Sequence, residues 1–190
     1  MTEELFRLDS YLSSCDALVV SADSKGIELD RTVFYATGGG QPGDQGVLRL
    51  MDGGEIDILD CQKDQESGQH IHIPTEGAAL PAVGERVIAE IDWARRHKLM
   101  RMHSCLHLLC AIVDGGVTGG QVGEEKSRLD FDLEDTSLDK EALTDRLNRL
   151  IIENHAVKIS SIRDAELAAN PDLVRTMSVQ PPTGAGKVRL

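Results

Sequence analysis

The sequence predicts an α+β fold, with a small N-terminal β-barrel-like domain followed by an antiparallel sheet packed with two long helices. Residues 1–92 hold many short β-prone runs separated by turn residues, which is typical of a small barrel or twisted antiparallel sheet. A long helical pattern begins after Asp92, and a second lies at 137–155. Short β-prone segments separate and follow these helices, so 93–190 is expected to form one α+β domain.

The N-terminal domain is expected to consist of short strands that are rich in β-branched residues or alternate between apolar and polar ones. They are predicted at 16–23, 25–30, 32–37, 46–51, 55–62, 70–74 and 85–92. His70 and His72 lie two apart in one of these strands and would share a face. Such a pair can bind a metal ion, but we interpret that strand as an exposed one.

The second domain is expected to begin with a helix over 93–113, with Asp92 as its N-cap and glycines after its last turn. Its apolar side chains follow a helical spacing that forms a core stripe. The later elements are predicted in this order: two strands around the glycines of 117–134, a helix at 137–155, a strand at 156–162, short helical turns at 164–175 and a strand in 186–190.

The composition, with 41% hydrophobic and 27% charged residues, is ordinary for a soluble globular protein. No apolar run approaches the roughly 18–20 residues of a membrane span, and the acidic, polar N-terminal segment is unlike a signal peptide. We therefore expect a cytoplasmic protein. Its four cysteines form no C-x-x-C pair, so free thiols are expected rather than disulfides.

The net charge of −12 is unfavourable for general nucleic-acid binding, which depends on basic side chains that neutralise phosphates. The segment RRHKLMR at 95–101 nevertheless holds four basic residues and no acid. This local basic strip is either a solvated helix face or a phosphate-binding surface.

The stretch RMHSCLHLLC places His103 and His107 four residues apart on the first long helix. Two side chains at this spacing face the same way and can bind one cation. They are fewer than the three or four protein ligands that zinc usually has. The pair is therefore either a part of a metal site or two histidines at the edge of the core.

A glycine-rich segment, FYATGGGQPGDQG at 34–46, lets the backbone adopt positive φ and approach another group closely. It lacks the ending of a P-loop, and no helical pattern follows it as in the dinucleotide-binding motif. The segment is either a binding loop or an elaborate turn of the barrel.

The glycine-rich segment, the H-x3-H helix and the strand KSRLDFDL together resemble the alanyl-tRNA editing domain, in both order and spacing. This domain is part of alanyl-tRNA synthetase and also exists as free-standing proteins, the AlaX group. The resemblance implies hydrolysis of the ester in mischarged alanine tRNA, chiefly seryl and in some members glycyl. It also implies zinc as the cofactor and tRNA as the partner; no protein partner is predicted.

The resemblance also implies roles for individual residues. His103 and His107 match the first pair of zinc ligands and are the expected catalytic centre. The hydroxyl of Thr32 would recognise the serine hydroxyl that alanine lacks. The rim of the site is expected at Gly38, Gly39, Gly40 and Gln41, and the phosphate contacts at Arg95, Arg96, Lys98 and Arg101.

The sequence departs from the family in one respect. A second pair of zinc ligands, C-x3-H, is expected after the second long helix, but none of the four cysteines has a histidine four residues later. We expect that the chain is truncated before this motif. One alternative is a catalytically inactive tRNA-binding or regulatory module, and another is an unrelated metallohydrolase that uses His103, His107 and Asp114.

Overall fold

The computed structural model describes residues 2–170, 173–174 and 186–189. The chain divides into two compact units, residues 1–101 and 102–190. The division lies within helix α1 (Trp93–Ile112), whereas the sequence places it at the start of that helix. Arg95 and Arg96, in the first turn of α1, are hydrogen-bonded to earlier residues of the first unit. No helix in the described part of the chain is long and apolar enough to cross a membrane.

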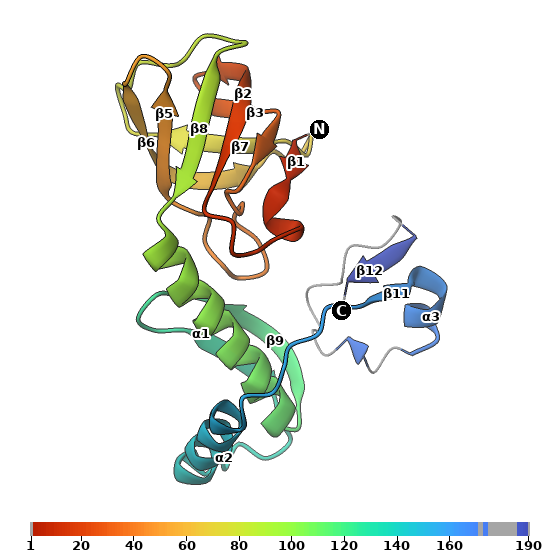
Figure 1. Cartoon of the computed structure of the whole chain (residues 1–190). Coiled ribbons are helices and arrows are strands. Elements are labelled where there is room, and N and C mark those ends of the chain that lie inside the picture. The colour runs from red at the N-terminus through yellow and green to blue at the C-terminus, as the bar shows by residue number, and fades with distance from the viewer. Residues whose placement is uncertain (1, 171–172, 175–185, 190) are drawn as a thin grey trace. The chain divides into compact units, whose positions relative to one another are not determined.

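The first unit contains a closed antiparallel barrel with the strand order β2-β3-β7-β6-β5-β8 (Figure 1). The barrel closes because β2 pairs with β3 along one edge and with β8 along the other. This confirms the predicted barrel. Its strands are β2 (Ser14–Asp23), β3 (Gly26–Leu29), β5 (Gly46–Leu50), β6 (Glu55–Lys63), β7 (His70–Pro74) and β8 (Arg86–Ile91).

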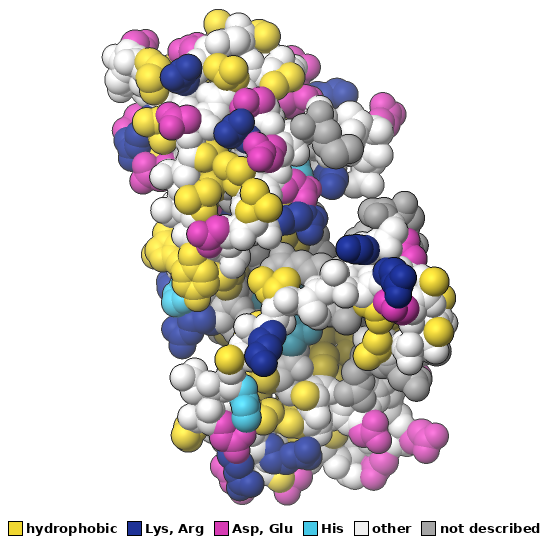
Figure 2. All heavy atoms as spheres, turned by 45° about the vertical axis from the view of Figure 1, so that its right-hand side comes forward, with side chains coloured by type: hydrophobic (Ala, Val, Ile, Leu, Met, Phe, Trp, Pro, Cys, Tyr) yellow, Lys and Arg dark blue, Asp and Glu magenta, His cyan; other side chains and the backbone are white. Residues whose placement is uncertain are grey.

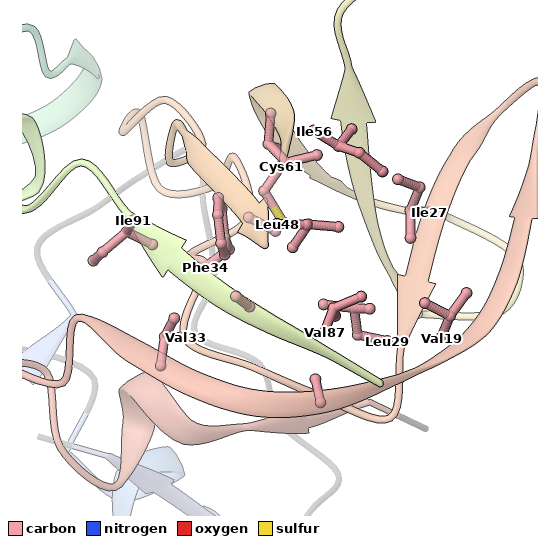
Figure 3. Packing of buried hydrophobic residues seen from close by; sticks show 14 residues of the cluster. Val19, Ile27, Leu29, Val33, Phe34, Leu48, Ile56, Cys61, Val87 and Ile91 are labelled. Atoms are coloured by element: carbon pink, nitrogen blue, oxygen red, sulfur yellow. The ribbon is translucent and has the colours of Figure 1, made fainter. Parts of the chain in front are cut away.

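Aliphatic side chains from five of the six barrel strands, all except β7, fill the interior, and Phe34 adds an aromatic ring from a loop (Figure 3). The strands alternate between the two faces of the sheet: in β6, Ile56 and Ile58 are buried, whereas Asp57 and Leu59 are exposed. This alternation is what an antiparallel sheet with one dry face requires. The barrel therefore provides a rigid support for the loops at its ends.

The predicted strand at 32–37 is wrong over most of its length. Only β4 (Arg31–Thr32) lies in a ladder, where it pairs in parallel with β1 (Glu3–Glu4), which precedes the short 3-10 helix η1 (Leu5–Arg7). The amide of Phe34 donates to the Thr32 hydroxyl at 3.0 Å, and the amide of Tyr35 donates to the Asp44 carboxylate at 2.7 Å. Side chains therefore satisfy the amides of Phe34 and Tyr35, whereas the amide of Thr37 donates to the Cys61 carbonyl of β6 at 2.8 Å.

The second unit combines α-helices with two separate two-stranded antiparallel sheets, β9 with β10 and β11 with β12. Helix α2 begins where the Asp139 side chain accepts the amide of Ala142 at 3.0 Å, and it ends at Asn154 in the left-handed conformation. After α1 the elements are β9 (Gly116–Gln121), β10 (Arg128–Asp132), α2 (Lys140–Glu153), β11 (Ser161–Arg163), α3 (Asp164–Ala168) and β12 (Lys187–Arg189).

These elements confirm the α+β class, with two local differences from the sequence-based expectation. The strand predicted at 156–162 is confined to β11. The helical turns predicted at 164–175 form α3, and the remainder lies partly outside the described residues. All four cysteines are free, as predicted. Burial raises the pKa of the Cys15 thiol to about 11, so this thiol is a poor nucleophile at neutral pH.

Candidate functional site

A tight turn forms the tip of the glycine-rich loop between β4 and β5. Gly38 and Gln41 exchange two backbone hydrogen bonds of 3.0 Å, and Gly39 and Gly40 between them have φ values of 56° and 78°. Glycine adopts positive φ at little cost, so this turn favours glycine at both central positions. The Tyr35 hydroxyl donates to the Gly38 carbonyl at 3.0 Å, and Gln41 is buried. The three glycines thus set the shape of the loop tip.

A buried ion pair holds the loop against the first turn of α1. The Nε of Arg96 donates to Asp44 Oδ1 at 2.8 Å, and its Nη2 contacts Asp44 Oδ2 and donates to the Val33 carbonyl at 2.8 Å. Arg96 and Asp44 are 3% and 1% exposed. The neighbouring Arg95 donates from Nη1 to the Gly43 carbonyl at 2.8 Å. Both arginines therefore fix the loop to the helix.

The four basic residues at the start of α1 consequently do not form one exposed strip. The guanidinium of Arg96 is unavailable to a phosphate in this structure, because Asp44 and Val33 take its N–H groups. Lys98 and Arg101 are exposed and make no ion pair within the described part of the chain. Figure 2 shows basic and acidic side chains interspersed over one face of the molecule. A phosphate contact stays a prediction for Arg95, Lys98 and Arg101.

Gly43 is a position where the loop tolerates no side chain. A Cβ there would overlap the Cys61 carbonyl oxygen and a carboxylate oxygen of Asp60. We expect Gly43→Ala to lower the free energy of unfolding by about 1–3 kcal/mol, because backbone atoms of β6 would have to move. Gly38→Ala is the matched control: its Cβ would meet nothing nearer than the Tyr35 hydroxyl at 3.6 Å. Urea unfolding measures both changes, and equal losses would contradict the prediction.

Thr32 lies in a buried hydrogen-bond network with His72. The Nδ1 of His72 is 2.9 Å from the Ile27 carbonyl, which can only accept, so Nδ1 carries the proton and Nε2 accepts. The Thr32 hydroxyl donates to Nε2 at 2.8 Å and accepts the amide of Phe34 at 3.0 Å. Thr32 and His72 are both 0% exposed. The hydroxyl of Thr32 is therefore used inside the protein in this structure, and its role toward a substrate stays a prediction.

The interpretation of the strand 70–74 as exposed is wrong. His70 and His72 share a face, as their spacing predicts, but they are 2% and 0% exposed. The ring of His70 lies 5.9 Å from that of Phe6, and its Nε2 is 3.5 Å from a carboxylate oxygen of Glu4. The N-terminal segment with β1 and η1 covers this histidine, and the sequence of the strand alone does not reveal that cover.

His103 and His107 lie on consecutive turns of α1 in the second unit, with ring centroids 5.1 Å apart and 13° between the ring planes. Burial lowers the pKa of His103, and the neighbouring His107 lowers it further. Both influences favour the neutral imidazole that binds metal ions. The helix thus brings the two imidazole rings together, as their spacing predicts.

The described residues fit a part of a zinc site rather than a whole one. Nowhere among them do three or more His, Cys, Asp or Glu side chains form a group that could hold a metal ion. Asp114 therefore does not join the two histidines as a third ligand. Zinc usually has three or four protein ligands, of which His103 and His107 would supply two.

Sequence reasoning missed two features of the first unit, the Arg96–Asp44 pair and the His72–Thr32 pair. Their partners lie 52 and 40 residues apart in the chain. The available signals are an aspartate in a glycine-rich loop and a histidine in an apolar strand, and neither identifies its partner.

Comparisons with known proteins agree with the sequence motifs. A sequence model of the family described as tRNA synthetases class II (A) matches residues 10–95. The alanyl-tRNA editing protein AlaX-M of Methanosarcina acetivorans is 40% identical over 168 residues, which cover 84% of this chain and 69% of that protein. The protein of the same name from Saccharolobus solfataricus is 32% identical over 188 residues, 96% of this chain and 78% of that protein. The alanine–tRNA ligase of Pyrobaculum neutrophilum is 43% identical over 109 residues, only 12% of its own length.

Proposed function

The chain belongs to the alanyl-tRNA editing proteins of the AlaX-M group, and on this basis we propose that it removes serine from mischarged alanine tRNA by zinc-dependent ester hydrolysis, with glycine as a second substrate. The observation that carries the proposal is the 40% identity to an editing protein over 84% of this chain. The chain is thus an aminoacyl-tRNA hydrolase whose substrate is tRNA. Editing of this kind is needed where binding alone rejects a similar amino acid too weakly.

His103 and His107 are proposed as the first two zinc ligands. Their position on one helix face and the lowered pKa of His103 support this assignment, because a metal ion binds neutral imidazole. Bound zinc would polarise an ester carbonyl or a water molecule. The remaining ligands are not assigned to described residues.

The glycine-rich loop is proposed to bind the amino-acid end of the substrate. Two observations support this proposal. Gly39 and Gly40 form a tight turn at the tip of the loop, and the buried pair of Asp44 and Arg96 fixes the loop to α1. Thr32 would act through the network with His72, since its hydroxyl already makes two internal hydrogen bonds. Lys98 and Arg101 are proposed to contact phosphates.

His103→Ala is expected to reduce deacylation of seryl-tRNA by about tenfold or more and to lower the bound zinc, because it removes one of the two neighbouring nitrogens. The measurements are release of serine from mischarged alanine tRNA, zinc content and tRNA affinity, which should be nearly unchanged. His155→Ala is the matched control, because this exposed histidine of the same unit bonds, among the described residues, only to Glu153 at 2.8 Å.

Unchanged hydrolysis in the His103→Ala protein would exclude this catalytic site. Tight tRNA binding by the wild-type chain without any release of serine would instead indicate a catalytically inactive binding module. Equal rates on seryl-tRNA and glycyl-tRNA would contradict the proposed preference for serine.

A further inference from the structure

The chain's single tryptophan lies in a partly exposed cluster of rings at the start of α1. Trp93 and His97 stack, with ring centroids 5.6 Å apart and 23° between the planes. Tyr11, from the turn after η1, lies 5.2 Å from Trp93 and 6.3 Å from His97. All three belong to the first unit.

Most of the Tyr11 ring faces solvent, since the residue is 63% exposed. Aromatic residues are only 3% of the chain, and large rings contribute most when they are buried. Trp93 packs partly against the barrel core, which explains its own position. That packing leaves the exposed ring of Tyr11 beside it unexplained.

Basic side chains continue this surface along the helix. Trp93, His97 and Arg101 follow one another at intervals of four residues, so they share a face of α1. Lys98 is also exposed, and in the portion of the chain that is described neither it nor Arg101 pairs with an acid. Rings and cations thus lie next to each other on a chain whose net charge is −12. This combination is typical of surfaces that bind single-stranded nucleic acid.

We propose that Tyr11, Trp93 and His97 form a stacking surface for an unpaired base of the bound tRNA, and that Lys98 and Arg101 contact the adjoining phosphates. The inference rests on the proposed function, because it takes tRNA as the ligand. The bases of a duplex are stacked on one another, whereas an unpaired base offers a free ring face to an aromatic side chain. The surface therefore selects single-stranded segments of the tRNA.

The test uses the full chain and a single-stranded RNA oligonucleotide that ends in CCA and carries no amino acid. Trp93 is the only tryptophan, so its fluorescence reports this surface directly. We expect the single-stranded RNA to quench this fluorescence and a duplex of the same length to leave it unchanged. The anisotropy of labelled RNA measures the affinity of each variant.

Tyr11→Ala is expected to weaken RNA binding by about fivefold or more. Tyr11→Phe keeps the ring and should bind RNA with the affinity of the wild type. Lys98→Ala should weaken binding and reduce its salt dependence. Lys25→Ala is the matched control, because it removes an exposed lysine from the turn between β2 and β3. Thermal unfolding of the Tyr11 variants should match the wild type, since the ring is mostly exposed.

Unchanged affinity in both Tyr11→Ala and His97→Ala would overturn the proposal, and so would equal quenching by the duplex. If the Trp93 fluorescence per molecule falls as the protein concentration rises in the absence of RNA, the surface binds a second copy of the chain. This result would also overturn the proposal. The RNA carries no ester, so this binding does not depend on hydrolysis. If the wild-type chain binds this RNA but does not deacylate mischarged tRNA, the result would contradict the proposed function and still support the stacking surface.

Discussion

Replacement of Arg96 by alanine is expected to lower the free energy of unfolding of the first unit by about 3–5 kcal/mol. The substitution leaves the Asp44 carboxylate buried without its cation, and the Val33 carbonyl without a donor. An uncompensated buried charge costs more than the intact pair contributes. Urea unfolding followed by Trp93 fluorescence measures the change, because this tryptophan belongs to the first unit.

The matched control is Arg49→Ala, which removes an arginine that bonds to Glu90 at 2.9 Å on the barrel surface. Its effect should be far smaller, because water screens both charges. Asp44→Asn should also be strongly destabilising, since it leaves the buried Arg96 cation without its counter-charge. Equal losses in the Arg96 and Arg49 variants would show that the buried pair does not hold the loop.

Acidification from pH 6.5 to about 4 is expected to weaken the barrel by about 3 kcal/mol through His72 alone, at about 1.4 kcal/mol per pH unit. Burial lowers the pKa of this histidine from 6.5 to about 4. The unfolded chain therefore takes up a proton near pH 6.5, whereas the folded protein resists it until about pH 4. This contribution to stability is complete above pH 6.5 and is lost as the pH falls through that range.

Other groups add to the acid sensitivity, so the test compares variants. Burial lowers the pKa of His70 as well, although Glu4 opposes this shift, and titration of carboxylates contributes at lower pH. His72→Gln should flatten the dependence of unfolding free energy on pH between 6.5 and 4, whereas His155→Gln at an exposed site should not. An NMR titration of His72 in the wild-type protein measures its pKa directly. A value near 6.5 would contradict the prediction.

The barrel was predictable because each strand carries its own signal. Strands such as β6 alternate between buried and exposed residues, and glycines or acidic residues mark the turns between strands. The segment after Thr32 was mistaken for a strand, since Val33 and Phe34 have the composition of one. The amides of Phe34 and Tyr35 bond instead to the side chains of Thr32 and Asp44, and the position of Asp44 depends on the folded loop.

The candidate site was predictable where its residues are neighbours in sequence. The spacing of His103 and His107 places them on one helix face, and the consecutive glycines indicate a turn with positive φ. The four basic residues at 95–101 were grouped because they are adjacent in the chain. The structure separates them, because a helix directs adjacent side chains to different sides, and only the packing of α1 on the loop turns Arg96 inward.

The sequence by itself determined the α+β class, the barrel, the histidine pair, the turn glycines and the relationship to the editing proteins, because these follow from local patterns or short motifs. Only the tertiary structure decided that Arg96 binds Asp44, that His72 binds Thr32 and that Tyr11 meets Trp93. Each of these contacts joins residues that are distant in the chain. Hydrogen bonding and burial hold them together in the folded protein, and no local pattern encodes which partners will be in contact.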